Sequence, residues 1–140
     1  MAAQKNISKH ITFEEATQSP TALRKGINNM PNDIQFLNMQ TVAEKCFEPL
    51  REWYGKPIKV NSFFRCEALN SAVGGAKNSQ HVGGNAIDMS AGSKEENKKL
   101  FEWCKNNLSF DQLINEYDFS WVHISYVSEK SNRKQIVVVK

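Results

Sequence analysis

Apolar positions recur at helical spacing in two segments of the chain. The first runs from Asn32 to Trp53, where the apolar residues fall close to one stripe of a helix, and Pro49 within it is expected to bend or break that helix. The second, SKEENKKLFEWCKNN, opens with Ser93, a residue type suited to the N-cap, and has Glu96 three positions later. The pattern therefore predicts two amphipathic helices.

Shorter apolar runs, several of them alternating with polar residues, predict strands elsewhere. Residues 58–64 and 86–92 each indicate one strand, and the second places Asp88 near its middle. The runs 110–117 and 121–127 are separated by three residues, which suits an antiparallel hairpin, and QIVVVK at the C-terminus indicates a last strand. Because helices come first and strands later, without regular βαβ alternation, we predict an α+β domain with a mainly antiparallel sheet flanked by helices.

The N-terminal residues 1–31 and the segment 67–75 are predicted to carry only short helical turns. Thr12 or Thr17 can cap a turn in the first segment, which we expect to wrap around the rest of the domain, and two glycines close the second. The sequence shows no repeat, linker or low-complexity stretch. A single domain over residues 1–140 is therefore expected.

The composition, 40% hydrophobic and 24% charged residues, indicates a globular chain rather than a disordered one. The net charge of +3 is small and the lysines are scattered, so they indicate an anionic partner only weakly. A polyanionic cell wall would suit this charge as well as nucleic acid would. Since a nucleic-acid-binding function would rest on the charge alone, we expect no nucleic-acid partner.

The chain also lacks the sequence features of an exported or membrane-inserted protein. Its N-terminus, MAAQKNISKHITFEE, has no apolar core behind the positive residues, and no later run is long enough to span a bilayer. The cysteines Cys46, Cys66 and Cys104 are odd in number and form no CxxC pair, which favours buried free thiols in a reducing compartment. We expect synthesis in the cytoplasm without a signal peptide, and no membrane insertion.

Two histidines and a carboxylate raise the hypothesis of a zinc site. His81 and Asp88 lie in SQHVGGNAIDMS, and His123 lies in WVHIS. Three such ligands leave one position for water, the arrangement of a catalytic zinc, which lowers the pKa of water to about 7. Gly83 and Gly84 would let the chain turn after His81, and neighbouring strands can bring ligands together. By itself, however, the spacing is more typical of ordinary surface or core histidines.

The wider pattern around these residues is far more specific. Arg65 precedes an S-x-H-x-x-G-x-A-x-D motif, and W-x-H follows it. The matching residues are Ser79, His81, Gly84, Ala86, Asp88, Trp121 and His123. From about Phe13 through the last strand, the sequence resembles the zinc D-Ala-D-Ala carboxypeptidase and L-alanyl-D-glutamate endopeptidase family, whose fold is shared with the hedgehog signalling domain. Within that family it is most similar to the small single-domain peptidases of phages and prophages.

This resemblance implies that His81, Asp88 and His123 are the protein ligands of a zinc ion (Zn2+). Many relatives have a histidine where this chain has Trp121, so an aromatic wall replaces a polar group beside the metal without removing a ligand. The resemblance further implies that Arg65 binds a substrate carboxylate or steadies the oxyanion at the scissile carbonyl. Without the family pattern, Arg65 would equally suit a surface salt bridge.

The catalytic base is expected to be a carboxylate that precedes the last histidine. Glu116 lies in the strand before the hairpin turn and corresponds best to the family's glutamate, whereas Asp118, the alternative, falls in the turn. Ser79, Gln80 and Trp121 are expected to contact the substrate. For Ser79 and Gln80 the simpler alternative is a role in capping the loop.

Together with the resemblance, these residues predict a zinc-dependent metallopeptidase that hydrolyses an amide bond in peptidoglycan stem peptides, an endolysin-like role in cell-wall degradation. The bond is either the D-Ala-D-Ala bond of a carboxypeptidase substrate or the L-Ala-D-Glu bond of an endopeptidase substrate. We expect a monomer that acts on a peptidoglycan peptide at the bacterial cell wall once it is released or delivered there. The alternative is a non-catalytic, zinc-containing binding module of the same fold, against which Arg65 and the presence of a candidate base argue.

Overall fold

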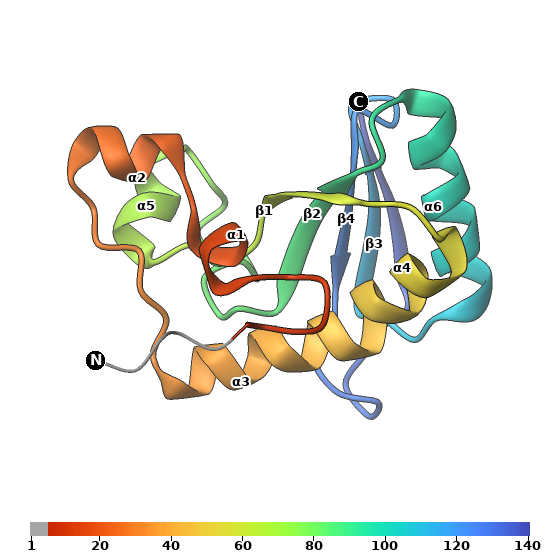
Figure 1. Cartoon of the computed structure of the whole chain (residues 1–140), viewed down its shortest axis with the longest axis horizontal. Coiled ribbons are helices and arrows are strands. Elements are labelled where there is room, and N and C mark those ends of the chain that lie inside the picture. Colours follow the sequence, from red (N-terminus) through yellow and green to blue (C-terminus); the bar gives the residue numbers. More distant parts are fainter. Residues whose placement is uncertain (1–5) are drawn as a thin grey trace.

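The structure, a computed structural model, describes residues 6–140 and contains a five-stranded sheet with helices (Figure 1). The helical elements are α1 (Phe13–Thr17), α2 (Pro20–Lys25), α3 (Asp33–Val42), the π-helical turn η1 (Ala43–Phe47), α4 (Glu48–Tyr54), α5 (Glu67–Ala72) and α6 (Lys94–Asn107). The strands are β1 (Lys59–Ser62), β2 (Ala86–Ser90), β3 (Gln112–Glu116), β4 (Trp121–Ser125) and β5 (Gln135–Val139). The first five residues of the expected N-terminal segment lie outside the described residues. Among residues 6–140, no helix combines the length and the hydrophobicity needed to cross a membrane.

The sheet has the strand order β1-β2-β4-β3-β5. The pairings β1 with β2, β2 with β4 and β4 with β3 are antiparallel, and β5 pairs with β3 in parallel. The expected hairpin is present, since Glu116 of β3 lies opposite Trp121 of β4. The predicted α+β class with a mainly antiparallel sheet is therefore confirmed.

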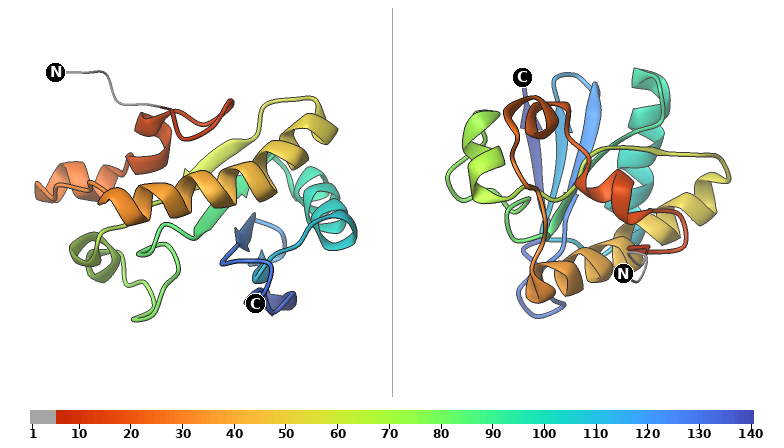
Figure 2. Two further views of the ribbon diagram at one scale, coloured as in Figure 1. Left: turned by 90° about the horizontal axis from the view of Figure 1, so that it is seen from below. Right: turned by 60° about the vertical axis from the view of Figure 1, so that its left-hand side comes forward.

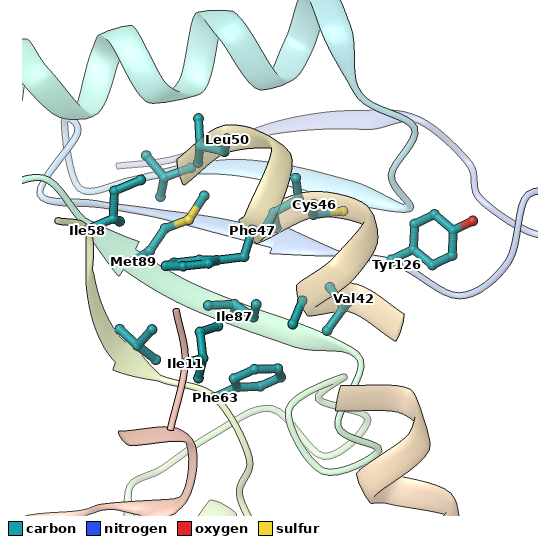
Figure 3. Packing of buried hydrophobic residues seen from close by; sticks show 14 of the residues in the cluster. Ile11, Val42, Cys46, Phe47, Leu50, Ile58, Phe63, Ile87, Met89 and Tyr126 are labelled. Carbon is teal, nitrogen blue, oxygen red and sulfur yellow. The ribbon is translucent and has the colours of Figure 1, made fainter. Parts of the chain in front are cut away.

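Helices cover one face of the sheet. Ile87 and Met89 of β2 lie beside Phe47 of η1 in the hydrophobic core (Figure 3). Helix α6 packs along β3 and β4 on the same side (Figure 1). Side chains alternate between the two faces along a strand, so Asp88, between Ile87 and Met89, points to the opposite face, as does its cross-strand neighbour His123.

The helix predicted over 32–53 forms, but it contains a π-helical turn. Asn32 caps α3, and its side chain accepts a hydrogen bond from the Gln35 N–H. The five residues of η1 then separate α3 from α4, and Pro49 lies in the first turn of α4. Proline has no N–H to donate, and its ring crowds the preceding turn. A widened π turn before the proline accommodates both effects better than a regular α-helical turn does. The α-helix is thus interrupted near Pro49, but α3, η1 and α4 still follow one another as one continuous helical segment (Figure 2).

The N-terminal segment contributes to the core. Ile11 and Phe13 are buried in the same hydrophobic cluster as the sheet residues. Thr12, one of the two expected caps, begins α1 through a capping box with Glu15, whereas the Thr17 hydroxyl donates to the Phe13 carbonyl inside the helix. Capping stabilises the short helix itself, and burial of Ile11 and Phe13 holds the segment against the rest of the chain.

The cysteines are free thiols, as expected. Cys46 and Cys104 are buried, and Cys66 is half-buried. Burial raises the pKa of the Cys46 thiol to about 12, so this thiol is neutral and unreactive near neutral pH.

Candidate metal centre

The sheet register brings two of the candidate ligands face to face. Asp88 of β2 lies directly opposite His123 of β4, and Asp88 Oδ1 is 2.9 Å from His123 Nδ1. His81 comes from the loop between α5 and β2, and its Nε2 lies 3.2 Å from Asp88 Oδ2. All three side chains are buried, and one candidate ligand atom from each lies within 4.8 Å of the others. The structure therefore brings together the three residues expected to hold a metal.

The orientation of His81 is fixed by its second ring nitrogen. Its Nδ1 lies 2.7 Å from the backbone carbonyl oxygen of Phe63. Because a carbonyl oxygen only accepts hydrogen bonds, Nδ1 carries the proton, and Nε2 keeps its lone pair toward Asp88. Carbonyl partners of this kind commonly set the tautomer and ring orientation of metal-binding histidines.

The charge and the spacing of the cluster both suit zinc. Burial raises the pKa of Asp88, but the neighbouring imidazole groups of His81 and His123 outweigh burial, so the pKa of Asp88 lies well below its ordinary value. Asp88 is therefore anionic at neutral pH and offsets part of a dication's charge. Ligands about 2.0–2.1 Å from a tetrahedral zinc lie roughly 3.4 Å apart, close to the 2.9 and 3.2 Å separations found here. Two imidazoles and a carboxylate also form a donor set that zinc favours where one position stays open.

Gly84 shapes the loop that delivers His81. It has a φ of +80°, and a Cβ added there would stand 2.6 Å from the Gln35 carbonyl oxygen and 2.9 Å from Met39 Cγ. Its backbone N lies 3.2 Å from the His81 carbonyl oxygen, a hydrogen bond that closes the turn after the histidine. Of the two glycines expected to allow this turn, Gly84 has the left-handed backbone and Gly83 does not.

We expect Gly84→Ala to lower the free energy of unfolding by about 2–4 kcal/mol, because alanine disfavours the left-handed backbone and its Cβ meets fixed backbone atoms. Gly74→Ala is the matched control. Gly74 also has a positive φ, +72°, but nothing lies within 4 Å of a Cβ added there, so its substitution should cost about 1 kcal/mol. Urea denaturation in the presence of a chelator measures both variants. Equal destabilisation would show that the contact with Gln35 is unimportant.

A cleft on the open face of the sheet surrounds the three candidate ligands. One wall is formed by the loop after α5, and the floor crosses the sheet through Ile114 of β3, which lies opposite His123. The remaining lining residues that bear on function are Arg65, Gln112, Glu116, Tyr117, Trp121 and Arg133.

Glu116 faces this cleft. It is half-buried on the open face of β3, opposite Trp121. Burial raises the pKa of Glu116, the negative charge of Asp88 raises it further, and the neighbouring His123 opposes the shift. A carboxyl group with a raised pKa beside a metal site is suited to taking up a proton and releasing it again.

Asp118 lies outside the cleft. It belongs to the hairpin turn and has a left-handed backbone, with φ +57°. Its side chain is 80% exposed, and its Oδ2 pairs with Lys94 Nζ at 3.1 Å. The geometry therefore favours Glu116 over Asp118 as the candidate base.

Arg65 lies at the edge of the metal cluster rather than in a surface salt bridge. Its Nε donates to Ser62 Oγ at 3.2 Å, and its Nη1 donates to Asn70 Oδ1 at 3.2 Å. Its Nη2 is 3.7 Å from Asp88 Oδ2. A half-buried guanidinium held in this way can donate to a carboxylate or an oxyanion next to the metal.

Ser79 and Gln80 line the cleft but have partners within the protein. The Ser79 Oγ accepts a hydrogen bond from the His81 N–H at 3.2 Å, which is the loop-capping role. The Gln80 Nε2 donates to Asp111 Oδ2 at 2.8 Å. Their contacts with substrate stay a prediction.

The aromatic wall expected from Trp121 is present and is extended by Tyr117. The two ring centroids lie 5.2 Å apart, and both residues line the cleft. The buried indole N–H of Trp121 makes no well-formed hydrogen bond within residues 6–140, yet it approaches Glu116 closely enough to oppose the rise in the pKa of that carboxyl.

The sequence patterns did not reveal Asp111 and Arg133. Arg133 lines the cleft, and its Nη2 lies 2.7 Å from Asp111 Oδ2. Both residues stand outside the motifs, and the 22 positions between them follow no local period that would pair them. Only the fold brings them together.

Comparison with known proteins identifies the family of this chain. A family model described as peptidase M15 matches residues 9–125, so the chain belongs to the peptidase M15 family. This confirms the family that the motifs indicated.

The name of a curated relative supports the expected metal. The zinc D-Ala-D-Ala carboxypeptidase of Streptomyces albus G is 56% identical to this chain over 39 residues. The matched stretch is 28% of this chain and 15% of the relative. The name of the relative and the His-Asp-His cluster agree on the expected cofactor, Zn2+.

Proposed function

We propose that this protein is a zinc-dependent metallopeptidase that hydrolyses an amide bond in peptidoglycan stem peptides. The observation that carries the proposal is the convergence of the His-Asp-His cluster, the half-buried Glu116 carboxyl group and the Arg65 guanidinium in one cleft. A module that used zinc only for structure would not need a carboxyl group of raised pKa facing the metal site. Membership of the peptidase M15 family supports the same interpretation.

His81, Asp88 and His123 would hold the ion, the histidines through His81 Nε2 and His123 Nδ1, the ring nitrogens that lie nearest Asp88. When bound, zinc supplies a Lewis acid that polarises the scissile carbonyl and acidifies water. Glu116 accepts a proton from the attacking water at its carboxylate and donates a proton to the nitrogen of the leaving amine. Arg65 donates hydrogen bonds to the oxyanion or to the carboxylate at the substrate terminus, and both are anions that a guanidinium recognises.

Of the two candidate bonds, we favour the D-Ala-D-Ala bond. Arg65 lies directly beside the metal cluster, where it suits a substrate whose free carboxylate belongs to the residue that leaves. The name of the Streptomyces albus G relative points to the same specificity. The L-Ala-D-Glu bond of an endopeptidase substrate is the alternative.

Mass spectrometry of defined peptidoglycan fragments incubated with the zinc-loaded protein tests the proposal. We expect release of free D-Ala, which a chelator abolishes and added zinc restores. A split L-Ala-D-Glu bond would change the assignment to an endopeptidase. If zinc is fully bound and no product forms, the peptidase proposal is wrong and a binding module replaces it.

Arg65→Lys is expected to retain the fold and the zinc but to lower kcat/KM by at least about tenfold, since an ammonium cannot reproduce the planar, two-pronged donation of a guanidinium. Arg24→Lys, at an exposed arginine of α2, is the matched control and should leave activity unchanged. Circular dichroism and metal analysis establish that fold and zinc content match the wild type. A wild-type rate in Arg65→Lys would contradict the anchoring role.

A further inference from the structure

A second arginine lines the cleft on the side away from Arg65. Arg65 is held beside β1, where its Nε donates to Ser62, whereas Arg133 lies in the loop before β5. The strands β1 and β5 are the two edges of the sheet, and the candidate ligands Asp88 and His123 lie on β2 and β4 between them. The two guanidinium groups therefore approach the cleft from opposite sides.

Arg133 is held in place by a buried carboxylate. Its Nε and Nη2 donate to the two carboxylate oxygens of Asp111 at 2.9 and 2.7 Å, and its backbone N–H donates to the same group at 3.0 Å. Asp111 is fixed in turn by Gln80, whose Nε2 donates at 2.8 Å, and by its own N–H, which donates to the Ser125 carbonyl at 2.8 Å. The hydrogen bond from Arg133 is the main reason that the pKa of Asp111 is lowered to about 2. Asp111 therefore stays ionised and keeps the guanidinium in one orientation.

Some N–H donors of the Arg133 guanidinium remain available to bind a ligand. An arginine side chain has five N–H donors, and Asp111 takes two of those of Arg133. Within residues 6–140, no other side chain or carbonyl accepts a hydrogen bond from the rest, and the side chain is 56% exposed where it lines the cleft. A guanidinium that is already fixed loses little conformational entropy on binding, so it forms a preorganised site for a carboxylate.

The position of Asp111 sets the distance between this site and the metal cluster. Ile114 of β3 lies opposite His123, and Asp111 immediately precedes β3, three residues before Ile114, a span of about 10 Å for an extended chain. An extended peptide covers about 3.3–3.6 Å per residue. A peptide whose reacting bond lies at the cluster would therefore bring a group two or three residues away to Arg133.

We propose that Arg133 forms a second carboxylate subsite of the cleft, which binds an acidic residue two or three positions from the reacting bond. This inference rests on the peptidase function proposed above. Asp111 is a positioning residue of the subsite, because it acts on the ligand through Arg133. In a stem peptide, the free α-carboxylate of the γ-linked D-glutamyl residue has this chemistry and this separation from the D-Ala-D-Ala bond.

A matched pair of pentapeptides tests the subsite: L-Ala-γ-D-Glu-L-Lys-D-Ala-D-Ala, and its analogue in which the glutamyl α-carboxylate is a carboxamide. With the zinc-loaded wild type we expect kcat/KM to be about tenfold higher for the acid, through KM rather than kcat, the size of one charge-assisted hydrogen bond. In Arg133→Gln the ratio should fall to about one. Because a general loss of stability would affect both peptides alike, the ratio isolates recognition. The control Arg24→Gln should keep the wild-type ratio.

The outcomes separate this inference from the proposed function. Equal KM values for the two peptides in the wild type, or a preference that survives in Arg133→Gln, would overturn the subsite while the peptidase function stands. Cleavage of neither peptide would instead contradict the proposed function. In that case, calorimetric titration of both peptides into the zinc-loaded protein decides the subsite. A preference for the acid that disappears in Arg133→Gln supports it, and equal binding rejects it.

Discussion

The variant His81→Ala is expected to lose bound zinc and hydrolytic activity together. The substitution removes one of the three candidate ligands and leaves only Asp88 and His123 to hold the ion. Loss of an outer partner of a ligand typically lowers metal affinity 10–100-fold, so loss of a direct ligand should lower zinc affinity by at least about 100-fold. Metal analysis of the gel-filtered variant and a peptide cleavage assay measure the two effects.

The matched control for this variant is His10→Ala. The His10 Nδ1 pairs with Glu48 Oε1 at 2.6 Å, and His10 belongs neither to the metal cluster nor to the lining of the cleft. His10→Ala should therefore keep its zinc and its activity. Full zinc occupancy in His81→Ala would show that the metal is held elsewhere.

Glu116→Gln should keep the zinc but lower kcat by at least about 10²-fold. Glutamine preserves the shape of the side chain but cannot take up a proton from water, and a positioned acid-base group typically contributes 10²–10⁴-fold. Because Glu116 is not one of the three clustered ligands, zinc content should match the wild type. Single-turnover cleavage of a stem peptide, together with metal analysis, separates the loss of proton transfer from the loss of metal.

Asp118→Asn is the control for this second variant and should be nearly silent. Asp118 is exposed and pairs with Lys94 on the surface, an interaction that typically contributes little. The reverse ranking, with Asp118→Asn inactive and Glu116→Gln active, would mean that the hairpin turn folds over the metal in the working enzyme. Full activity in both variants would assign the proton transfer to another group.

Much of the fold could be predicted where an element is determined by its own residues. Ser93 caps α6 by accepting a hydrogen bond from the Glu96 N–H, as its position in the sequence predicts. Asn32 and Pro49 likewise indicate the start of α3 and an interruption before α4. The parallel pairing of β5 with β3 was not predictable in this way, because QIVVVK carries no signal of the strand beside which it lies.

In the candidate site, too, local motifs could be predicted from the sequence, whereas contacts between distant segments could not. The sequence was sufficient to single out His81, Asp88 and His123, because each belongs to one of the motifs on which the resemblance to the family rests. The orientation of His81 depends on the Phe63 carbonyl, 18 positions away, and no sequence pattern gives it. The sequence favoured Glu116 over Asp118 through the resemblance alone, and the positions of the two carboxyl groups relative to the cleft depend on the hairpin register, which the structure supplies.

Two of the three candidate ligands lie in paired strands, whereas much of the cleft wall lies in loops. Asp88 and His123 lie on neighbouring central strands, whose backbone hydrogen bonds fix their separation, whereas Arg133, residues 73–80 and the third candidate ligand, His81, lie in loops. Loops tolerate insertion and substitution far better than paired strands do. Changes in a loop that carries no candidate ligand, such as the loop before β5, can therefore alter peptide recognition while the ligands on β2 and β4 stay in place. An engineer who wants altered specificity should diversify the loop before β5 and leave β2 and β4 untouched.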